Sequence, residues 1–142
     1  MEASKLLIEK LKEFEGLRLE AYRDAAGVLT IGYGHTGSDV LAGDRITEYY
    51  AKELLMDDLG RFEAAVRQLH VAHTQGQFDA LVSFAFNLGI GWLRGSTLLK
   101  TIREGGSKAQ ITREFKRWVY AGGQKLRGLE RRREWEAKRF FE

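Results

Sequence analysis

The sequence contains no cysteine and no proline among its 142 residues. The absence of cysteine excludes disulfide bonds, thiolate metal sites and cysteine nucleophiles. Average usage of about 5% predicts roughly seven prolines in this length, so their absence is unusual. No apolar run approaches the roughly 20 residues of a membrane-spanning helix, so we expect no membrane insertion. The N-terminus lacks the apolar core of a signal peptide, which predicts synthesis in a cytoplasm.

The composition is otherwise that of a folded globular protein. Hydrophobic residues make up 44% of the chain and aromatic residues 11%, which suits one compact unit or two small lobes that share a core. The net charge of +3 fits either an ordinary solvated surface or attraction to a polyanion such as bacterial cell wall or nucleic acid. The sequence has no phosphate-binding glycine loop and no nucleic-acid motif, so we expect no nucleic-acid partner.

The hydrophobic spacing changes along the first 35 residues. Apolar residues recur every three or four positions from Leu6 to Leu17, which predicts a helix that begins after Ser4 and ends near Gly16. The pattern then alternates from Leu29 to Tyr33, as in a strand. A partner strand is predicted over 19–23, joined by a type I turn at 24–27, where Asp comes first and Gly last. These signals predict a β-hairpin.

The rest of the chain has a helical pattern. Thr47 can cap a long helix, although Gly60 in its interior weakens the prediction of one unbroken rod. Capping signals predict further helices after Thr74, Ser96 and Ser107, and apolar spacing predicts a last helix over about 129–141. A small hairpin within a mainly helical chain indicates the α+β class.

Two carboxylates and one hydroxyl in and beside the predicted hairpin suggest a site that hydrolyses glycosidic bonds. Hydrolysis of a glycosidic bond needs a carboxylic acid that protonates the leaving oxygen and a second carboxylate that activates water or attacks carbon. Glu15 lies at the end of the first helix, next to apolar residues that favour a protonated acid. Asp24 lies in the hairpin turn, and the hydroxyl of Thr30 can help to hold a water. Asp24 also suits a purely structural turn role.

Small residues share the strand face of Thr30. Gly32 and Gly34 alternate with the apolar residues of the strand, and glycine in a strand often marks a place where something approaches the backbone closely. A sugar ring is one candidate, and a neighbouring helix is the other.

The stretches around these residues resemble a known family. Residues 15–24 read EGLRLEAYRD and residues 30–36 read TIGYGHT, and further matches lie at 77–89, 96–99 and 128–134. The spacing Glu, eight residues, Asp, five residues, Thr is that of the phage lysozymes (endolysins) of glycoside hydrolase family 24. The resemblance implies one lysozyme domain over 1–142, in which a helix from about 47 joins a small hairpin lobe (about 15–46) to a helical lobe (about 70–142 plus the N-terminal helix).

The resemblance also implies an activity. The family hydrolyses the β-1,4 bond between N-acetylmuramic acid and N-acetylglucosamine in bacterial peptidoglycan, without a cofactor or a metal. Glu15 would be the general acid, Asp24 would position or activate water, and Thr30 would assist it. Family members are commonly inverting, which calls for carboxyl groups roughly 6.5 to 9.5 Å apart. We expect a monomer that acts on the wall after release from the cell.

Further residues match positions that line the family's sugar-binding cleft. They are Thr36, Phe86, Asn87, Ser96 or Thr97, and Arg131. Phe86 suits plain core equally well. The arginine run 131–133 is either a solvated face or a source of one guanidinium, Arg131, that pairs with Glu15 or binds substrate.

The three histidines carry other predictions. His35 follows Thr30 closely, and we expect it to have a structural role, paired with Asp58 on the long helix. His70 and His73 can share a helical face, but no third ligand candidate lies nearby in the sequence, so we expect no metal site.

Two other functions stay open. A lytic transglycosylase would need no water held by Asp and would release 1,6-anhydro-muramyl ends. A non-catalytic peptidoglycan-binding module would bind walls without lysing them, which the complete set of Glu15, Asp24 and Thr30 disfavours. Family members usually carry proline in loops and before the arginine run, where Arg127 stands, and this departure suggests an artificial or engineered member.

Overall fold

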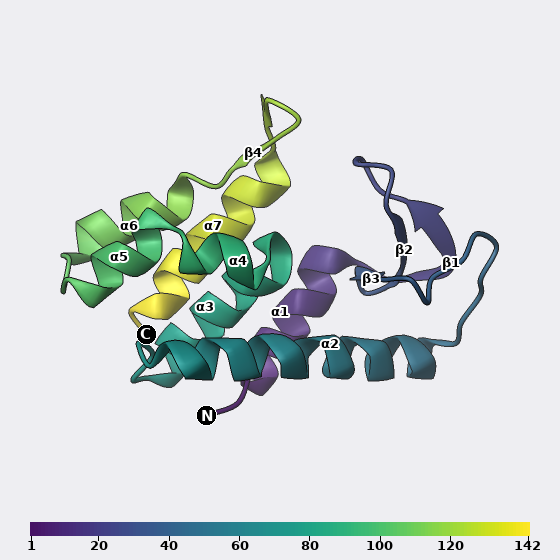
Figure 1. The fold of residues 1–142 in the computed structure, drawn as a ribbon, viewed down its shortest axis with the longest axis horizontal. Helices are drawn as coiled ribbons and strands as arrows, with labels where there is room; N and C mark the ends of the chain where they lie inside the picture. Colours follow the sequence, from purple (N-terminus) through teal and green to yellow (C-terminus); the bar gives the residue numbers. More distant parts are fainter. The chain divides into compact units, whose positions relative to one another are not determined.

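The computed structural model describes all 142 residues, which form seven helices and five short strands (Figure 1). This mixture confirms the α+β class. The elements in chain order are α1 (Lys5–Glu15), β1 (Arg18–Arg23), β2 (Leu29–Gly32), β3 (His35–Thr36), α2 (Glu48–Leu69), α3 (Gln75–Leu88), α4 (Ile90–Arg94), α5 (Thr97–Arg103), α6 (Lys108–Lys116), β4 (Tyr120–Ala121), β5 (Gln124–Lys125) and α7 (Arg127–Phe140).

The chain divides into two compact units. The hairpin unit consists of Ile8–Arg61, and the helical unit consists of Met1–Leu7 together with Phe62–Glu142. Helices α1 and α2 each contribute residues to both units.

The hairpin unit is built on an antiparallel sheet with the strand order β1-β2-β3. The predicted turn at 24–27 is present, because the Gly27 amide donates to the Asp24 carbonyl at 2.9 Å. The sheet packs through Ile31 on Leu54 of α2 and on Val40, which form the small core of this unit. Strand β3 was not predicted, because two residues are too short to show an alternating pattern.

Helix α2 is continuous over 22 residues, so Gly60 does not interrupt it. A Cβ at Gly60 would meet no atom within 4 Å, so no close contact depends on this glycine. Leu55 and Leu59, one helical turn apart, are 1% and 0% exposed. Burial of this apolar stripe offsets the cost of about 1 kcal/mol that glycine adds to a helix interior.

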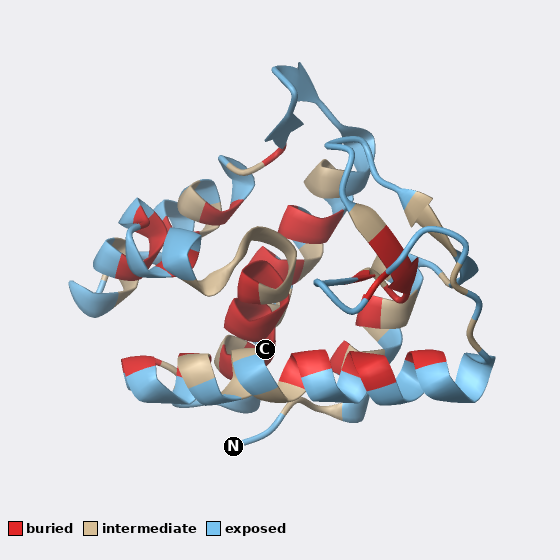
Figure 2. Ribbon diagram, turned by 45° about the vertical axis from the view of Figure 1, so that its right-hand side comes forward, coloured by how far each residue is buried: buried red, intermediate tan, exposed pale blue.

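Helices α3 and α7 form the centre of the helical unit. Helix α3 is buried along most of its length (Figure 2). Gly76 permits the close approach of the two helices, since a Cβ there would overlap the Arg139 carbonyl oxygen and lie 2.7 Å from that of Glu142. Phe84 of α3 packs edge-on against Phe115 and Trp118 at ring distances of 5.9 and 5.7 Å.

Side-chain caps begin the helices as the sequence predicts. Thr74 with Gln77 and Ser107 with Gln110 both form complete capping boxes, at the starts of α3 and α6. Ser96 caps α5 through its hydroxyl, which accepts from the Leu99 amide at 3.0 Å. These local signals depend on neighbouring residues alone, which is why the sequence reveals them.

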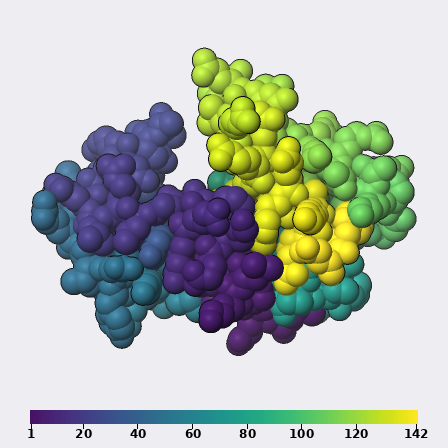
Figure 3. Space-filling view, turned by 180° about the vertical axis from the view of Figure 1, so that it is seen from behind, coloured from purple at the N-terminus to yellow at the C-terminus, as the bar shows by residue number.

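Two short elements of the helical unit were not predicted. One is the single-turn helix α4. The other is the β4–β5 hairpin, which Gly122 and Gly123 close with φ of 57° and 79°. The hairpin projects beyond α7 in the space-filling view (Figure 3). None of the helices is both long and apolar enough to cross a lipid bilayer.

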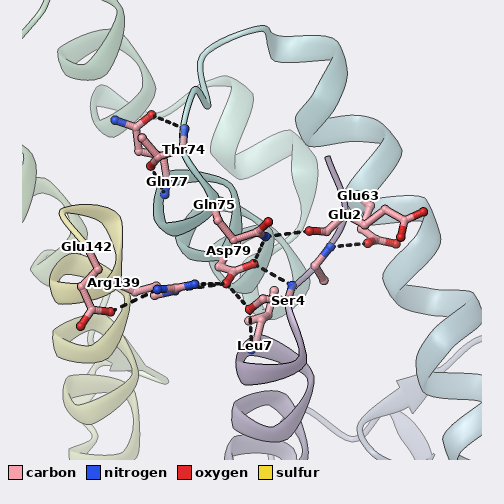
Figure 4. Close-up of polar contacts among 11 residues, drawn as sticks. Glu2, Ser4, Leu7, Glu63, Thr74, Gln75, Gln77, Asp79, Arg139 and Glu142 are labelled. Carbon is pink, nitrogen blue, oxygen red and sulfur yellow. Dashed lines mark hydrogen bonds and ion pairs between the residues drawn. The ribbon is translucent and has the colours of Figure 1, made fainter.

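Within the helical unit, a buried carboxylate ties the first residues of the chain to α3 and α7. Asp79 of α3 is 0% exposed. It accepts hydrogen bonds from the amide and hydroxyl of Ser4, from Gln75 at 2.9 Å, and from the Arg139 guanidinium at 2.9 and 3.1 Å (Figure 4). Ser4 in turn accepts from the Leu7 amide at 3.1 Å, so it caps α1 while Asp79 holds it.

Candidate functional site

Glu15, the predicted general acid, is the last residue of α1 and is half-buried. The turn between β2 and β3 passes directly beside its carboxyl group. A Cβ at Gly34 would overlap Glu15 Oε1 and lie 3.0 Å from Glu15 Cδ. Gly34 also has a φ of 74°, which side chains with a Cβ rarely adopt. Only glycine therefore lets this backbone support the acid so closely.

The other glycine of the strand faces a helix as well. A Cβ at Gly32 would lie 3.4 Å from Ala51 Cβ of α2 and 3.4 Å from Ile46 Cδ1. The sequence left a sugar ring and a neighbouring helix as explanations for these small residues. In the structure, the neighbour of Gly32 is helix α2 and the neighbour of Gly34 is helix α1.

Asp24 follows β1 and organises the hairpin turn. Its side chain is exposed, and Oδ1 accepts hydrogen bonds from the amides of Ala26 and Val28, both at 2.9 Å. These two bonds fix the orientation of the carboxylate, and Oδ2 remains available to a water. Asp24 can therefore hold the turn through Oδ1 and also position a water through Oδ2.

Thr30 is linked to Asp24 through a single carbonyl group. The Thr30 hydroxyl donates to the Val28 carbonyl at 2.9 Å, and the Asp24 amide donates to the same oxygen at 3.0 Å. Thr30 is 4% exposed. The structure thus brings these two predicted residues together at the base of the turn. Thr36 is exposed on β3, directly opposite Thr30 in the sheet.

The predicted pairing of His35 with Asp58 is confirmed. His35 Nδ1 lies 2.7 Å from Asp58 Oδ2, and Nε2 lies 2.9 Å from Asp39 Oδ2. Burial lowers the pKa of His35, but the hydrogen bonds with Asp58 and Asp39 outweigh it, so the net pKa is raised. The hydrogen bond with His35 lowers the pKa of Asp39. Since both ring nitrogens face carboxylates, the pairing favours the doubly protonated imidazolium.

Five of the predicted substrate-binding residues lie in the helical unit, in differing environments. Phe86 is half-buried and packs on Phe62, with ring centroids 5.3 Å apart. Asn87 is half-buried and accepts a hydrogen bond from Arg133. Ser96 is 8% exposed, and its hydroxyl is engaged by the Leu93 carbonyl and the Leu99 amide. Thr97 and Arg131 are exposed.

The arginine run is not a solvated face. Only Arg131 is exposed, while Arg132 and Arg133 are 4% and 0% exposed. Both buried guanidinium groups pair with Glu136, which is itself 0% exposed. Sequence reasoning missed this cluster because adjacent charges usually indicate surface. The i, i+3 and i, i+4 spacing to Glu136 was the available signal.

Chemically, the hairpin unit presents a carboxyl group at a helix end and a second carboxylate in a turn. No group of three or more histidine, cysteine or acidic residues has the arrangement of a metal site. The sequence marked Gly34 as a place of close approach, but it did not reveal that the neighbour is the Glu15 carboxyl group, because the two positions lie far apart in the chain.

Comparisons with known proteins agree with this architecture. The model of the family described as phage lysozyme matches residues 12–136. The endolysins of Bacillus phages PZA and B103 are both 45% identical to the chain over 99% of its length. The chain spans 55% and 54% of those two proteins, about half of their length.

A solved structure gives the same result for the fold. The muramidase domain of SpmX from Asticaccaulis excentricus superposes with a TM-score of 0.87 at 39% sequence identity, covering 99% of this chain and 98% of that one. The fold is therefore lysozyme-like, with small antiparallel sheets in a mainly helical protein. The chain belongs to the phage lysozyme family.

Proposed function

We propose that the chain is an endolysin-type lysozyme that hydrolyses the β-1,4 bond between N-acetylmuramic acid and N-acetylglucosamine in peptidoglycan. Family membership supports the substrate class. The observation that carries the proposal is the support of the Glu15 carboxyl group by the Gly34 backbone, because a general acid must be held in one position relative to the bond it protonates.

In the proposed reaction, Glu15 donates a proton to the glycosidic oxygen as that bond breaks. Asp24, held by the amides of Ala26 and Val28, orients a water through its other oxygen and accepts a proton as the water attacks the anomeric carbon. Thr30 holds the turn through the Val28 carbonyl, and its oxygen can accept a hydrogen bond from the same water. The chain acts as one lysozyme domain over 1–142, needs no cofactor, and works as a monomer on walls exposed after release.

Product analysis tests this proposal. Purified peptidoglycan is digested with the protein, and the soluble fragments are identified by mass spectrometry. A lysozyme yields fragments with reducing N-acetylmuramic acid ends. Fragments with 1,6-anhydro-muramyl ends would instead establish a lytic transglycosylase, and wall binding without soluble fragments would establish a non-catalytic module.

A further inference from the structure

The two units carry formal charges of opposite sign. The helical unit contains 16 of the 23 Lys and Arg residues and nine of the 20 Asp and Glu residues, so its net charge is +7 (16 minus 9). The hairpin unit contains the other seven basic and 11 acidic residues, which gives a net charge of −4 (7 minus 11). A surplus of one sign attracts polymers of the opposite sign. We therefore expect an anionic partner to bind to the helical unit.

A surface pocket of about 440 Å³ lies in this unit, where α5 follows α4. Its charged lining residues are Arg94 of α4, Lys100 and Arg103 of α5, and Glu104, which follows α5. All four are exposed. Ser96 also lines this α4–α5 pocket, but its hydroxyl is engaged in capping α5. The charged side chains are therefore the groups that are available to a ligand.

The three cations of the α4–α5 pocket have no partner within the protein. The side chains of Arg94, Lys100 and Arg103 form no ion pair and no hydrogen bond in the structure. Lys100 and Arg103 lie three positions apart on α5, a spacing at which like charges on a helix repel each other. The helix dipole favours cations in a last turn, but it does not explain why three of them line one pocket. A bound anion would relieve their repulsion.

The side chains that line the pocket indicate which anion fits it. Arg94 and Arg103 carry planar guanidinium groups, each of which can bind two oxygens of one phosphate group at once. None of the residues that line the pocket is aromatic. Proteins that bind single-stranded nucleic acid combine cations with aromatic rings on which the bases stack. The pocket therefore suits a phosphate backbone that carries no bases.

We propose that Arg94, Lys100 and Arg103 form a binding site for a phosphodiester polymer of the bacterial cell wall, such as poly(glycerol phosphate), which holds the protein on the wall. The choice of a wall polymer rests on the proposed function, because a protein that hydrolyses peptidoglycan acts where such polymers occur. The proposal goes beyond that function, since none of the three cations takes part in the proposed cleavage.

A triple variant tests the site. In Arg94→Gln/Lys100→Gln/Arg103→Gln, the pocket loses its three positive charges. Binding of purified poly(glycerol phosphate) is measured by calorimetry at low ionic strength, where screening of exposed charges is weakest. We expect the affinity to fall at least about tenfold, because three contacts with phosphate groups are lost. The melting temperature should not fall, since the repulsion among the three side chains is removed.

A second triple variant is the matched control. Lys5→Gln/Arg127→Gln/Lys138→Gln also removes three exposed and unpaired cations of the helical unit, but none of them lines the α4–α5 pocket. We expect this control to weaken binding less than about threefold, since it changes only the net charge. Equal losses in the two triple variants would overturn the proposal, because the net charge alone would then explain the binding.

Glu104 provides a test in the opposite direction. Its carboxylate lines the same pocket and repels an anion. Glu104→Gln should therefore bind poly(glycerol phosphate) at least about twofold more tightly. Glu2→Gln, which removes an exposed carboxylate of the helical unit outside the pocket, should change the affinity less. The same affinity in Glu104→Gln and Glu2→Gln would place the polymer outside the pocket and contradict the proposal.

Two other polyanions test the class of ligand. The wild type should bind poly(glycerol phosphate) more tightly than poly-glutamate or duplex DNA of equal charge. Equal affinity for poly-glutamate would show attraction to any polyanion, and tighter binding of DNA would indicate a nucleic-acid site. Either result would overturn the proposal. These measurements involve no cleavage, whereas the hydrolase activity is judged from the fragments released from peptidoglycan, so the two proposals can fail separately.

Discussion

The backbone of Gly34 lies directly against the carboxyl group of Glu15, with no room for a side chain at position 34. The contact joins the turn after β2 to the last residue of α1. The backbone at position 34 closes one side of the proposed general acid, and this close approach explains why a glycine occurs at this point of the hairpin unit.

The first prediction concerns this contact. In Gly34→Ala, the new methyl group must displace the Glu15 carboxyl group, so we expect wall lysis to fall more than tenfold. Gly43→Ala is the matched control, because Gly43 has a similar φ of 87° but nothing within 4 Å of a Cβ. Both substitutions should destabilise the fold by about 1 kcal/mol through backbone strain. Equal lysis by the two variants, measured as loss of turbidity, would contradict the supporting role of Gly34.

The second prediction separates the two roles of Asp24. Asn at this position keeps the oxygen that accepts from Ala26 and Val28, but it loses the negative charge. We expect Asp24→Asn to melt within a few degrees of the wild type and to lose most of its lysis activity. Asp24→Ala should lose activity and also about 1 kcal/mol of stability, since the turn loses its side-chain acceptor. Full activity in Asp24→Asn would leave Asp24 as a turn residue only.

The third prediction concerns pH. The pKa of His35 is raised in the folded protein, so its contribution to stability is present below the unfolded pKa of about 6.5 and is lost as pH rises through the folded value. The pKa of Asp39 is lowered, so its contribution is present above the unfolded value of about 4 and is lost as pH falls. The other oxygen of Asp58, Oδ1, accepts a hydrogen bond from Arg61 Nη2 at 2.5 Å.

Melting temperatures measured between pH 4 and 9 test this prediction. The wild type should lose stability as the pH rises above about 6.5, and His35→Gln should lack this loss. His73→Gln, which removes an exposed imidazole of the helical unit, serves as the control. Parallel pH profiles for the wild type and His35→Gln would show that the two carboxylates do not hold the imidazolium.

The fourth prediction concerns Asp79. Asp79→Asn leaves the buried part of the Arg139 guanidinium without a carboxylate and removes an acceptor from Ser4, so we expect a loss of about 3 to 5 kcal/mol in unfolding free energy. Glu142→Gln is the control, because Glu142 contacts Arg139 at 3.5 Å on the exposed side, and its loss should be below about 1 kcal/mol. Denaturant titration measures both. Similar small losses in the two variants would mean that the Asp79 cluster adds little to stability.

The sequence predicted the parts of the fold that depend on local chemistry. The capping residues Thr74 and Ser107 and the turn at 24–27 are recognisable because each acts on residues three or four positions away. The sequence did not settle whether α2 continues through Gly60. The helix is unbroken because the burial of Leu55 and Leu59 outweighs the low helix propensity of glycine, and this burial depends on tertiary contacts.

The candidate site was predictable only in part. Residue spacing and family resemblance picked out Glu15, Asp24 and Thr30, but not the carbonyl of Val28 that links the last two. The burial of Arg133 beside Asn87 joins α7 to α3 across 46 positions. Such contacts arise from packing, which a run of three arginines does not reveal.

The most direct test of the account is wall lysis by Glu15→Gln, compared with the wild type at equal concentration. Glutamine keeps the size and the place beside Gly34 but cannot donate an acidic proton. We predict an unchanged melting temperature, retained binding to walls, and lysis at least a hundredfold slower, as expected from loss of a general acid. Lysis by Glu15→Gln at the wild-type rate would contradict the assignment of Glu15 as the acid, and with it the proposed mechanism.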